Sequence, residues 1–107
     1  MKAAVYRDPK GDIIGFQISG HSDYNPDGED ILCAAVSVLV INCINSIERF
    51  TEDETDILAV NEEEGFFHFR LKTLSEGSRL LLNSLVLGLQ SLEESYGKFI
   101  QIQFEEV

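Results

Sequence analysis

Short apolar segments open the chain, and a polar stretch separates them. The first covers residues 2–7 and the second residues 13–19, in which Ile14, Phe16 and Ile18 occupy alternate positions. The polar stretch between the two segments contains a Pro and a Gly, which favour a turn. Because side chains two residues apart share one face of a strand, this pattern predicts a β-hairpin.

A long apolar run follows a polar region. Residues 20–29 include Pro26, Gly28 and three acids, a composition that predicts a mobile loop. In residues 31–41 ten of the eleven residues are apolar, and about twenty residues from this point onward lack Gly and Pro. We therefore expect a helix that starts near Ile31 and is buried on most sides at its start.

The second half of the chain repeats this order of elements. Apolar runs at residues 57–60 and 66–71, separated by Asn-Glu-Glu-Glu-Gly, predict a second hairpin. A second helix is expected next, because Thr73 and Glu76 have the spacing of a capping box and leucines recur at helical intervals. Gly97 is the predicted stop of this helix.

A closing strand completes the predicted fold. Apolar residues alternate over residues 99–104, so the order of elements becomes ββαββαβ. Two hairpins and two helices that can lie on one sheet face predict an α+β, two-layer domain with a five-stranded mixed sheet. A chain of 107 residues fits one such domain, spanning residues 1–107.

Acidic residues are unevenly distributed along the chain. Nineteen acids against eight Lys and Arg give a formal net charge of -11. Residues 23–64 hold twelve acids and only Arg49 as a base, a balance of -11, and the other residues hold seven acids and seven bases. This acidity argues against direct binding to nucleic acid, which needs a basic surface. It is instead suited to a basic protein partner.

The cysteines and the N-terminus bear on location and cofactors. Cys33 and Cys43 fall in one predicted helix and provide neither a disulfide framework nor paired zinc knuckles. Two distant histidines add too few ligands for a metal site, so we expect no metal and no cofactor. Charge appears too early in residues 1–8 for a secretory signal, and we expect no apolar stretch that reaches the roughly 20 residues of a membrane span. These features predict a cytoplasmic protein without a membrane partner.

Candidate chemistry lies where the predicted loop meets the first helix. With Asp30 as the N-cap, Cys33 is the third helical residue and lies in the first turn. There the positive end of the helix dipole favours a thiolate, and unpaired backbone N–H groups can hold an oxyanion. His21 follows the preceding strand, from which it can act as a base toward the thiol.

Each of these residues also has a purely structural interpretation. A cysteine in an apolar helix is more often a small core residue, and we assign Cys43 to that class. Asp30 is most simply an N-cap, and its charge alone would oppose ionisation of a nearby thiol. His68 is out of phase with the apolar positions of its strand, which favours the solvent face. The acidic runs at residues 52–54 and 62–64 are typical of solvated loops and turns.

Two motifs together resemble a known family. Gly20-His21 is followed, after a variable acidic loop, by the sequence Asp-Ile-Leu-Cys-Ala-Ala-Val-Ser at residues 30–37. This pair of motifs is similar to the signature of the ribosomal-processing cysteine protease family, Prp. Neither motif alone is specific, but the likeness also extends over nearly the whole chain, including the Leu-rich second helix.

The resemblance implies a homodimeric cysteine endopeptidase that removes an N-terminal extension from large-subunit ribosomal protein twenty-seven. It implies cutting after a hydrophobic, Phe-containing sequence, with Cys33 as the nucleophile and His21 as the general base. Asp30 and Ser37 match family positions and are possible supporting residues without an assigned catalytic role. In the family, the segment that corresponds to residues 22–29 is a mobile cover over the site.

A second function remains open at this point. The protein would then be a non-enzymatic, acidic, dimeric module for ribosome biogenesis, which binds a basic ribosomal protein and uses the helix around Cys33 as core. The charge supports both functions, since an acidic surface attracts a basic partner whether or not that partner is cut. The reactivity of Cys33 distinguishes them.

Overall fold

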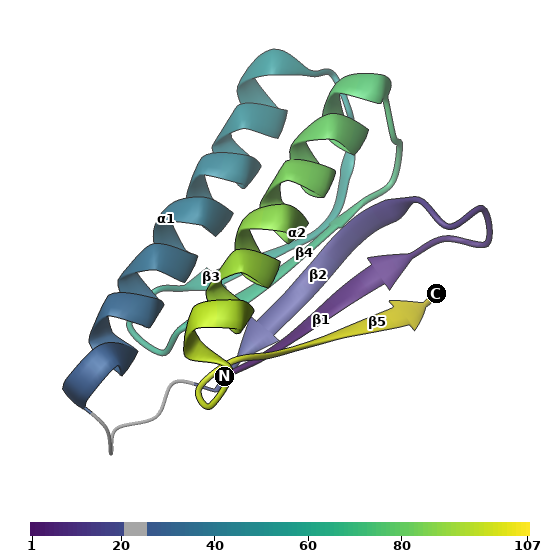
Figure 1. Ribbon diagram of the computed structural model, residues 1–107. Coiled ribbons are helices and arrows are strands. Elements are labelled where there is room, and N and C mark those ends of the chain that lie inside the picture. The colour runs from purple at the N-terminus through teal and green to yellow at the C-terminus, as the bar shows by residue number, and fades with distance from the viewer. Residues whose placement is uncertain (21–25) are drawn as a thin grey trace.

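Two helices lie on one face of a five-stranded sheet in the computed structural model (Figure 1). It describes residues 1–20 and 31–107, and for residues 26–30 only the helical backbone. The elements in chain order are β1 (Lys2–Arg7), β2 (Ile13–Ser19), α1 (Pro26–Phe50), β3 (Thr55–Asn61), β4 (Phe66–Leu71), α2 (Glu76–Tyr96) and β5 (Gln101–Glu106). The predicted two-layer α+β fold and its ββαββαβ order are confirmed.

The sheet has the strand order β3-β4-β2-β1-β5 and is mixed, as predicted. β1 pairs antiparallel with β2 and parallel with β5, and β4 pairs antiparallel with both β2 and β3. The parallel pair places Met1 beside the start of β5, where its amino group donates a hydrogen bond to the carbonyl of Phe99 at 2.9 Å, and places the C-terminal Val107 beside Arg7 at the other end of β1. The closing strand begins at Gln101, two residues later than predicted, directly after the buried Ile100.

Strand register explains which part of the sheet the helices cover. Val5, Phe16 and Phe69 are partners on the central strands, and all three side chains are almost fully buried. The partners in the same row on the edge strands are exposed, with Leu58 on β3 at 49% and Phe104 on β5 at 39%. Two helices thus cover three strands and leave the helix-facing side of both edge strands open.

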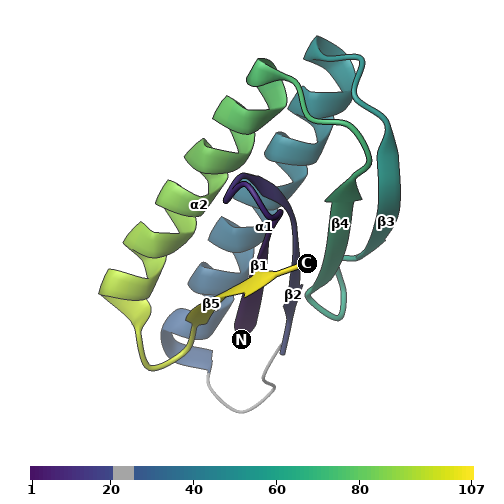
Figure 2. The ribbon, with the colours of Figure 1, turned by 90° about the vertical axis from the view of Figure 1, so that its right-hand side faces the viewer.

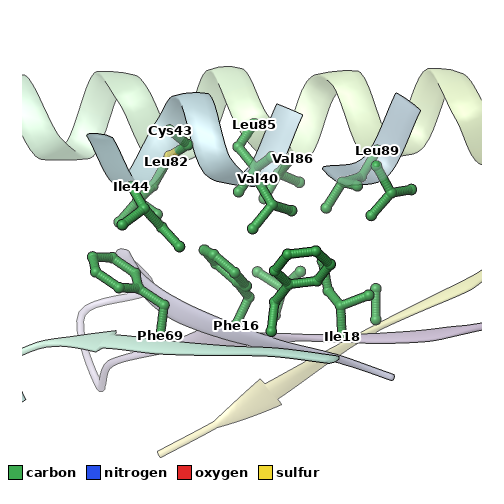
Figure 3. Close-up of a cluster of buried hydrophobic side chains, with 14 of the residues drawn as sticks. Phe16, Ile18, Val40, Cys43, Ile44, Phe69, Leu82, Leu85, Val86 and Leu89 are labelled. Atoms are coloured by element: carbon green, nitrogen blue, oxygen red, sulfur yellow. The ribbon is translucent and has the colours of Figure 1, made fainter. Parts of the chain in front are cut away.

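The core forms between the helices and the central strands. Figure 3 shows Val40 and Ile44 of α1, with Leu89 of α2, pointing toward the sheet. From the sheet, the rings of Phe16 and Phe69 point back at them, with their centroids 5.6 Å apart. Full burial of each such side chain contributes about 1.5–3 kcal/mol, so this layer stabilises the packing of α1 on the sheet.

The first helix begins earlier than predicted. α1 starts at Pro26 rather than near Ile31, because Pro is favoured at the first helical position, where its fixed φ fits and its missing N–H has no helical partner to lose. Asp30 is therefore not the N-cap, and Cys33 is not in the first turn. The predicted loop is wrong for residues 26–29, and the remainder of the family's mobile cover, residues 22–25, lies outside the described residues.

The second helix begins at a different cap from the one predicted. Ser75 is the N-cap, and its hydroxyl accepts a hydrogen bond from the backbone N–H of Ser78 at 3.2 Å. The capping box of Thr73 and Glu76 is therefore wrong, since Thr73 lies outside the helix. Gly97 does follow the last helical residue, as predicted, but with a φ of -59° it needs no left-handed backbone.

The apolar length of α1 differs from expectation. Within it, Ile31–Phe50 is long and apolar enough to cross a membrane by length and composition, with a mean hydropathy of 1.9. The expectation of no such stretch is therefore wrong. A core helix passes the same test, and Leu32, Val36 and Val40 are fully buried against the rest of this fold. Burial in the core therefore explains why one side of this helix is apolar.

Candidate active site

Cys33 is the eighth residue of α1, and its side chain is half-buried. In an α-helix, the backbone N–H at this position is bonded to the carbonyl four residues earlier, so it is not an open donor. The dipole effect also falls off within the first turn. The expectation that Cys33 lies in the first turn, beside unpaired amides and the positive end of the helix dipole, is therefore wrong.

The flank of α1 that carries Cys33 faces away from α2. Ser37 and Ile41 follow Cys33 at intervals of four residues, and such positions share one side of a helix. On the side of α1 toward α2, the thiol of Cys43 donates a hydrogen bond to the carbonyl of Leu81 at 3.7 Å. Figure 2 shows α1 between α2 and the β3–β4 hairpin, so the flank of Cys33 faces that hairpin.

A groove runs between α1 and β3, and we call it the α1–β3 groove. Its two adjoining hollows have volumes of about 340 and 270 Å³ and share Ile41 and Asn45. The hollow closer to the start of α1 is lined by Ser37, Val38, Ile41, Asn42, Asn45 and Glu62. The second is lined by Ile41, Ile44, Asn45, Glu48, Leu58 and Val60. Because Ser37 is four residues after Cys33, the groove begins about one helical turn from the thiol.

The predicted base lies outside the described residues. His21 follows Gly20, the residue after β2, and the end of β2 lies at the same end of the molecule as the start of α1 (Figure 1). A pairing of His21 with Cys33 therefore stays a prediction. The same holds for a supporting role of Asp30, whose backbone lies in α1 three residues before Cys33 and whose side chain is not described. Ser37 is half-buried in the groove.

Cys43 and His68 lie where the sequence predicts. Burial raises the pKa of the Cys43 thiol to about 12, and the side chain is 5% exposed in the core. His68 lies on the sheet face opposite the helices, as the register partner of Gln17, with its ring edge-on to Tyr6 at 6.0 Å. Within residues 1–20 and 31–107, no group of three or more His, Cys, Asp or Glu side chains could hold a metal ion.

A cluster around Asp53 has no counterpart in the sequence analysis, which assigned residues 52–54 to a solvated run. Asp53 is half-buried and accepts hydrogen bonds from Ser75, Ser78 and Thr73. Burial alone would raise the pKa of this carboxyl, but the hydrogen bonds outweigh it and hold the pKa at about 2. The cluster joins the α1–β3 connection to the start of α2. The Ser-x-x-Ser spacing of Ser75 and Ser78 at the start of α2 was the one available signal.

Comparison with known proteins agrees with the fold and the motifs. The family described as cysteine protease Prp has a sequence profile that matches residues 1–101. The ribosomal processing cysteine protease Prp of Staphylococcus aureus strain Mu50 is 29% identical over 97 residues, which cover 90% of this chain and 91% of that protein. The protein of the same name from Bacillus subtilis strain 168 is 26% identical over 101 residues, covering 90% and 89%.

A solved structure shows the same architecture. The crystal structure of the essential ribosomal processing protease Prp from S. aureus, in complex with a covalently linked product peptide, matches this fold with a TM-score of 0.84. The sequence identity is 26%, and the match covers 97% of this chain and 98% of that one. A profile match over nearly the whole chain and a shared fold lead to one conclusion: the chain belongs to the Prp family of ribosomal processing cysteine proteases.

Proposed function

We propose that the protein is an endopeptidase that removes the N-terminal extension of large-subunit ribosomal protein twenty-seven, cutting after a hydrophobic, Phe-containing sequence. Cys33 is the nucleophile and His21 the general base. The chain belongs to a cysteine protease family, and the observation that carries this proposal is that its two cysteines lie in different environments. Cys43 is buried and protonated at neutral pH, whereas Cys33 is half-buried and lies one helical turn before an open groove.

The mechanism follows from these roles. The Cys33 thiolate attacks the scissile carbonyl carbon, a C–S bond forms, and the carbonyl oxygen becomes an oxyanion. Protonated His21 gives its proton to the leaving amine as the C–N bond breaks. Water then attacks the thioester while His21 takes its proton, and the thiolate of Cys33 leaves. Since the Cys33 amide is engaged within α1, other donors must stabilise the oxyanion.

A peptide substrate is supported by the relative from S. aureus, whose structure carries a covalently linked product peptide. A covalent link to product is the kind of species that nucleophilic catalysis generates. Ribosomal processing, the activity in the names of both relatives, supports a basic ribosomal protein precursor as the client. The net charge of -11 favours capture of such a client.

We further propose that the protein is a homodimer in the cytoplasm. This assignment rests on the family resemblance. Sedimentation equilibrium at micromolar concentration tests it, with a mass of twice 12.0 kDa expected and a monomer contradicting it.

The competing function is a binding module that does not cut. The acidic charge favours it as much as it favours the protease, so chemistry must separate the two. We expect iodoacetamide at pH 7 to alkylate Cys33 much faster than Cys43 and to abolish processing. A Cys33→Ala variant should still bind the precursor without cutting it. If Cys33 resists alkylation and the variant processes normally, the protease proposal fails.

A further inference from the structure

The α1–β3 groove runs along α1 from Ser37 to Glu48, on the flank that carries Cys33. Cys33, Ser37 and Ile41 share one flank, and Glu48 lies near the far end of that same flank. The groove therefore begins one helical turn beyond the thiol and leads away from it along this flank.

Exposed aliphatic side chains make up the floor and one wall of this groove. Leu58 and Val60, on the helix-facing side of β3, are 49% and 43% exposed. Val38 of α1 is 68% exposed at the wall. These side chains lie in the two adjoining hollows between a helix and an edge strand, an arrangement that suits an extended segment with apolar side chains.

Acidic side chains line both hollows of the groove. Glu62, next to the end of β3, lines the first, and Glu48 lines the second. Residues 31–64 contain eight acids and only Arg49 as a base. Neither Glu48 nor Glu62 forms a salt bridge with any cation of residues 1–20 or 31–107. An apolar floor between unneutralised carboxylates is complementary to apolar side chains flanked by cations.

We infer that the α1–β3 groove docks a segment of the protein substrate in which apolar residues are flanked by Lys or Arg, a few residues away from the scissile bond. The inference rests on the proposed function, because that function places the scissile bond at Cys33. The docked segment adds selectivity at a distance from the thiol.

A second copy of this chain is a poorer occupant of the groove. In a two-fold contact through this surface, Glu48 and Glu62 of each copy would face the acids of the other. Like charges brought together in this way oppose association. A basic client segment instead neutralises both carboxylates.

Helix geometry sets where the cations of the substrate should be. Glu48 is fifteen residues after Cys33, which corresponds to about 22 Å along a helix with a rise of 1.5 Å per residue. An extended peptide covers that span in roughly six or seven residues. Glu62 lies opposite Ser37 and its neighbours, nearer the thiol. Cations roughly three and six residues from the scissile bond therefore fit the two carboxylates.

The experiment compares fluorescein-labelled substrate peptides that carry Lys or Gln at the third and sixth residues, on either side of the scissile bond. Binding is measured by fluorescence anisotropy with Cys33→Ala protein, and cleavage with the protein that retains Cys33. Both are repeated with the Glu48→Gln/Glu62→Gln double variant. The Glu94→Gln/Glu106→Gln variant, which removes two exposed acids outside the groove, is the matched control for net charge. A Leu58→Gln variant tests the floor, with its melting temperature as the control for folding.

We expect one of the Lys peptides to bind roughly threefold to tenfold more tightly than its Gln counterpart. The difference should be lost in Glu48→Gln/Glu62→Gln, kept in Glu94→Gln/Glu106→Gln and reduced by salt. Equal binding of Lys and Gln peptides overturns the inference. The inference also fails if the Glu48→Gln/Glu62→Gln variant changes the oligomeric state but leaves the binding of both peptides unchanged. Cleavage without Lys preference refutes the docking and leaves the protease intact. Lys-selective binding without any cleavage refutes the protease and leaves the docking intact.

Discussion

Ser75 donates two hydrogen bonds to one carboxylate oxygen of Asp53, from its backbone N–H at 3.0 Å and from its hydroxyl at 2.6 Å. The hydroxyl of Thr73 donates to the other oxygen at 3.2 Å. One carboxylate therefore ties the connection after α1 to the N-cap of α2, and its charged form is the form that the structure holds. The same contact orients α2 against the core that supports the α1–β3 groove.

Replacing Asp53 by Asn should lower the free energy of unfolding at pH 7 by about 1–2 kcal/mol, discounted because the group is partly solvated. The pKa of Asp53 is about 2 in the folded protein, below its ordinary value. The stabilisation is therefore complete above about pH 4 and is lost as the pH falls toward 2. Urea melts at pH 7, 4 and 2.5 measure this, with Glu52→Gln as control. If Asp53→Asn lowers the free energy of unfolding by the same amount at all three pH values, the charge of Asp53 does not stabilise the fold.

Cys43 should weaken the protein at alkaline pH. Its pKa is raised by burial to about 12, so the unfolded state releases this proton first, and stability falls from about pH 9 to pH 12. In a Cys43→Ala variant we expect a flatter profile of unfolding free energy above pH 9, a cost of about 1 kcal/mol at pH 7, and unchanged processing. Thermal melts of both proteins across this pH range test the prediction. If stability falls equally steeply with pH in both proteins, ionisation of Cys43 is not the cause.

Gly15 should tolerate no side chain. A Cβ at this position would lie 2.3 Å from the Phe69 carbonyl oxygen and 2.8 Å from the Arg70 Cα, both backbone atoms of β4. Gly15→Ala must push β2 and β4 apart, and we expect a loss of more than about 3 kcal/mol. Gly11→Ala is the matched control, since its φ of +87° is strained but its Cβ meets nothing within 4 Å, and it should cost about 1 kcal/mol. Equal melting temperatures for the two variants would refute this.

Ser37 should affect substrate binding more than chemistry. Its side chain lines the groove one turn beyond Cys33, so its hydroxyl is placed to contact substrate. For Ser37→Ala we expect KM to rise by roughly twofold to tenfold with kcat nearly unchanged, the pattern of a lost ground-state contact. Steady-state cleavage of a peptide substrate measures both constants. A fall in kcat comparable to that of Cys33→Ala would instead assign Ser37 to the chemical step.

Alternating patterns predicted the strands well because the core selects one face of each. Phe16 and Ile18 are buried on β2, and the same row continues through Phe69 of β4, so period-two alternation carried real information. Helix ends were predicted less well. Asp30 and Pro26 are both good start signals, and Thr73 and Ser75 are both good caps, so local preference alone could not choose between them.

The site depends on relationships that no local pattern contains. Asp53 bonds with residues twenty or more positions away, which made it look like an ordinary acid of a solvated run. The α1–β3 groove exists because two helices cover three strands of five, a result of packing across the whole sheet. Cys33 was found through a motif, but its place in α1 differs from the first turn that the motif suggested.

The most direct test of the central claim is the intact mass of ribosomal protein twenty-seven carrying its N-terminal extension, before and after incubation with the purified protein. We predict a single defined loss from the N-terminus, on a timescale of minutes to hours, that Cys43→Ala retains and Cys33→Ala abolishes. A precursor whose mass is unchanged by the protein, or is shortened equally well by Cys33→Ala, would contradict the assignment of this chain as a processing protease that acts through Cys33.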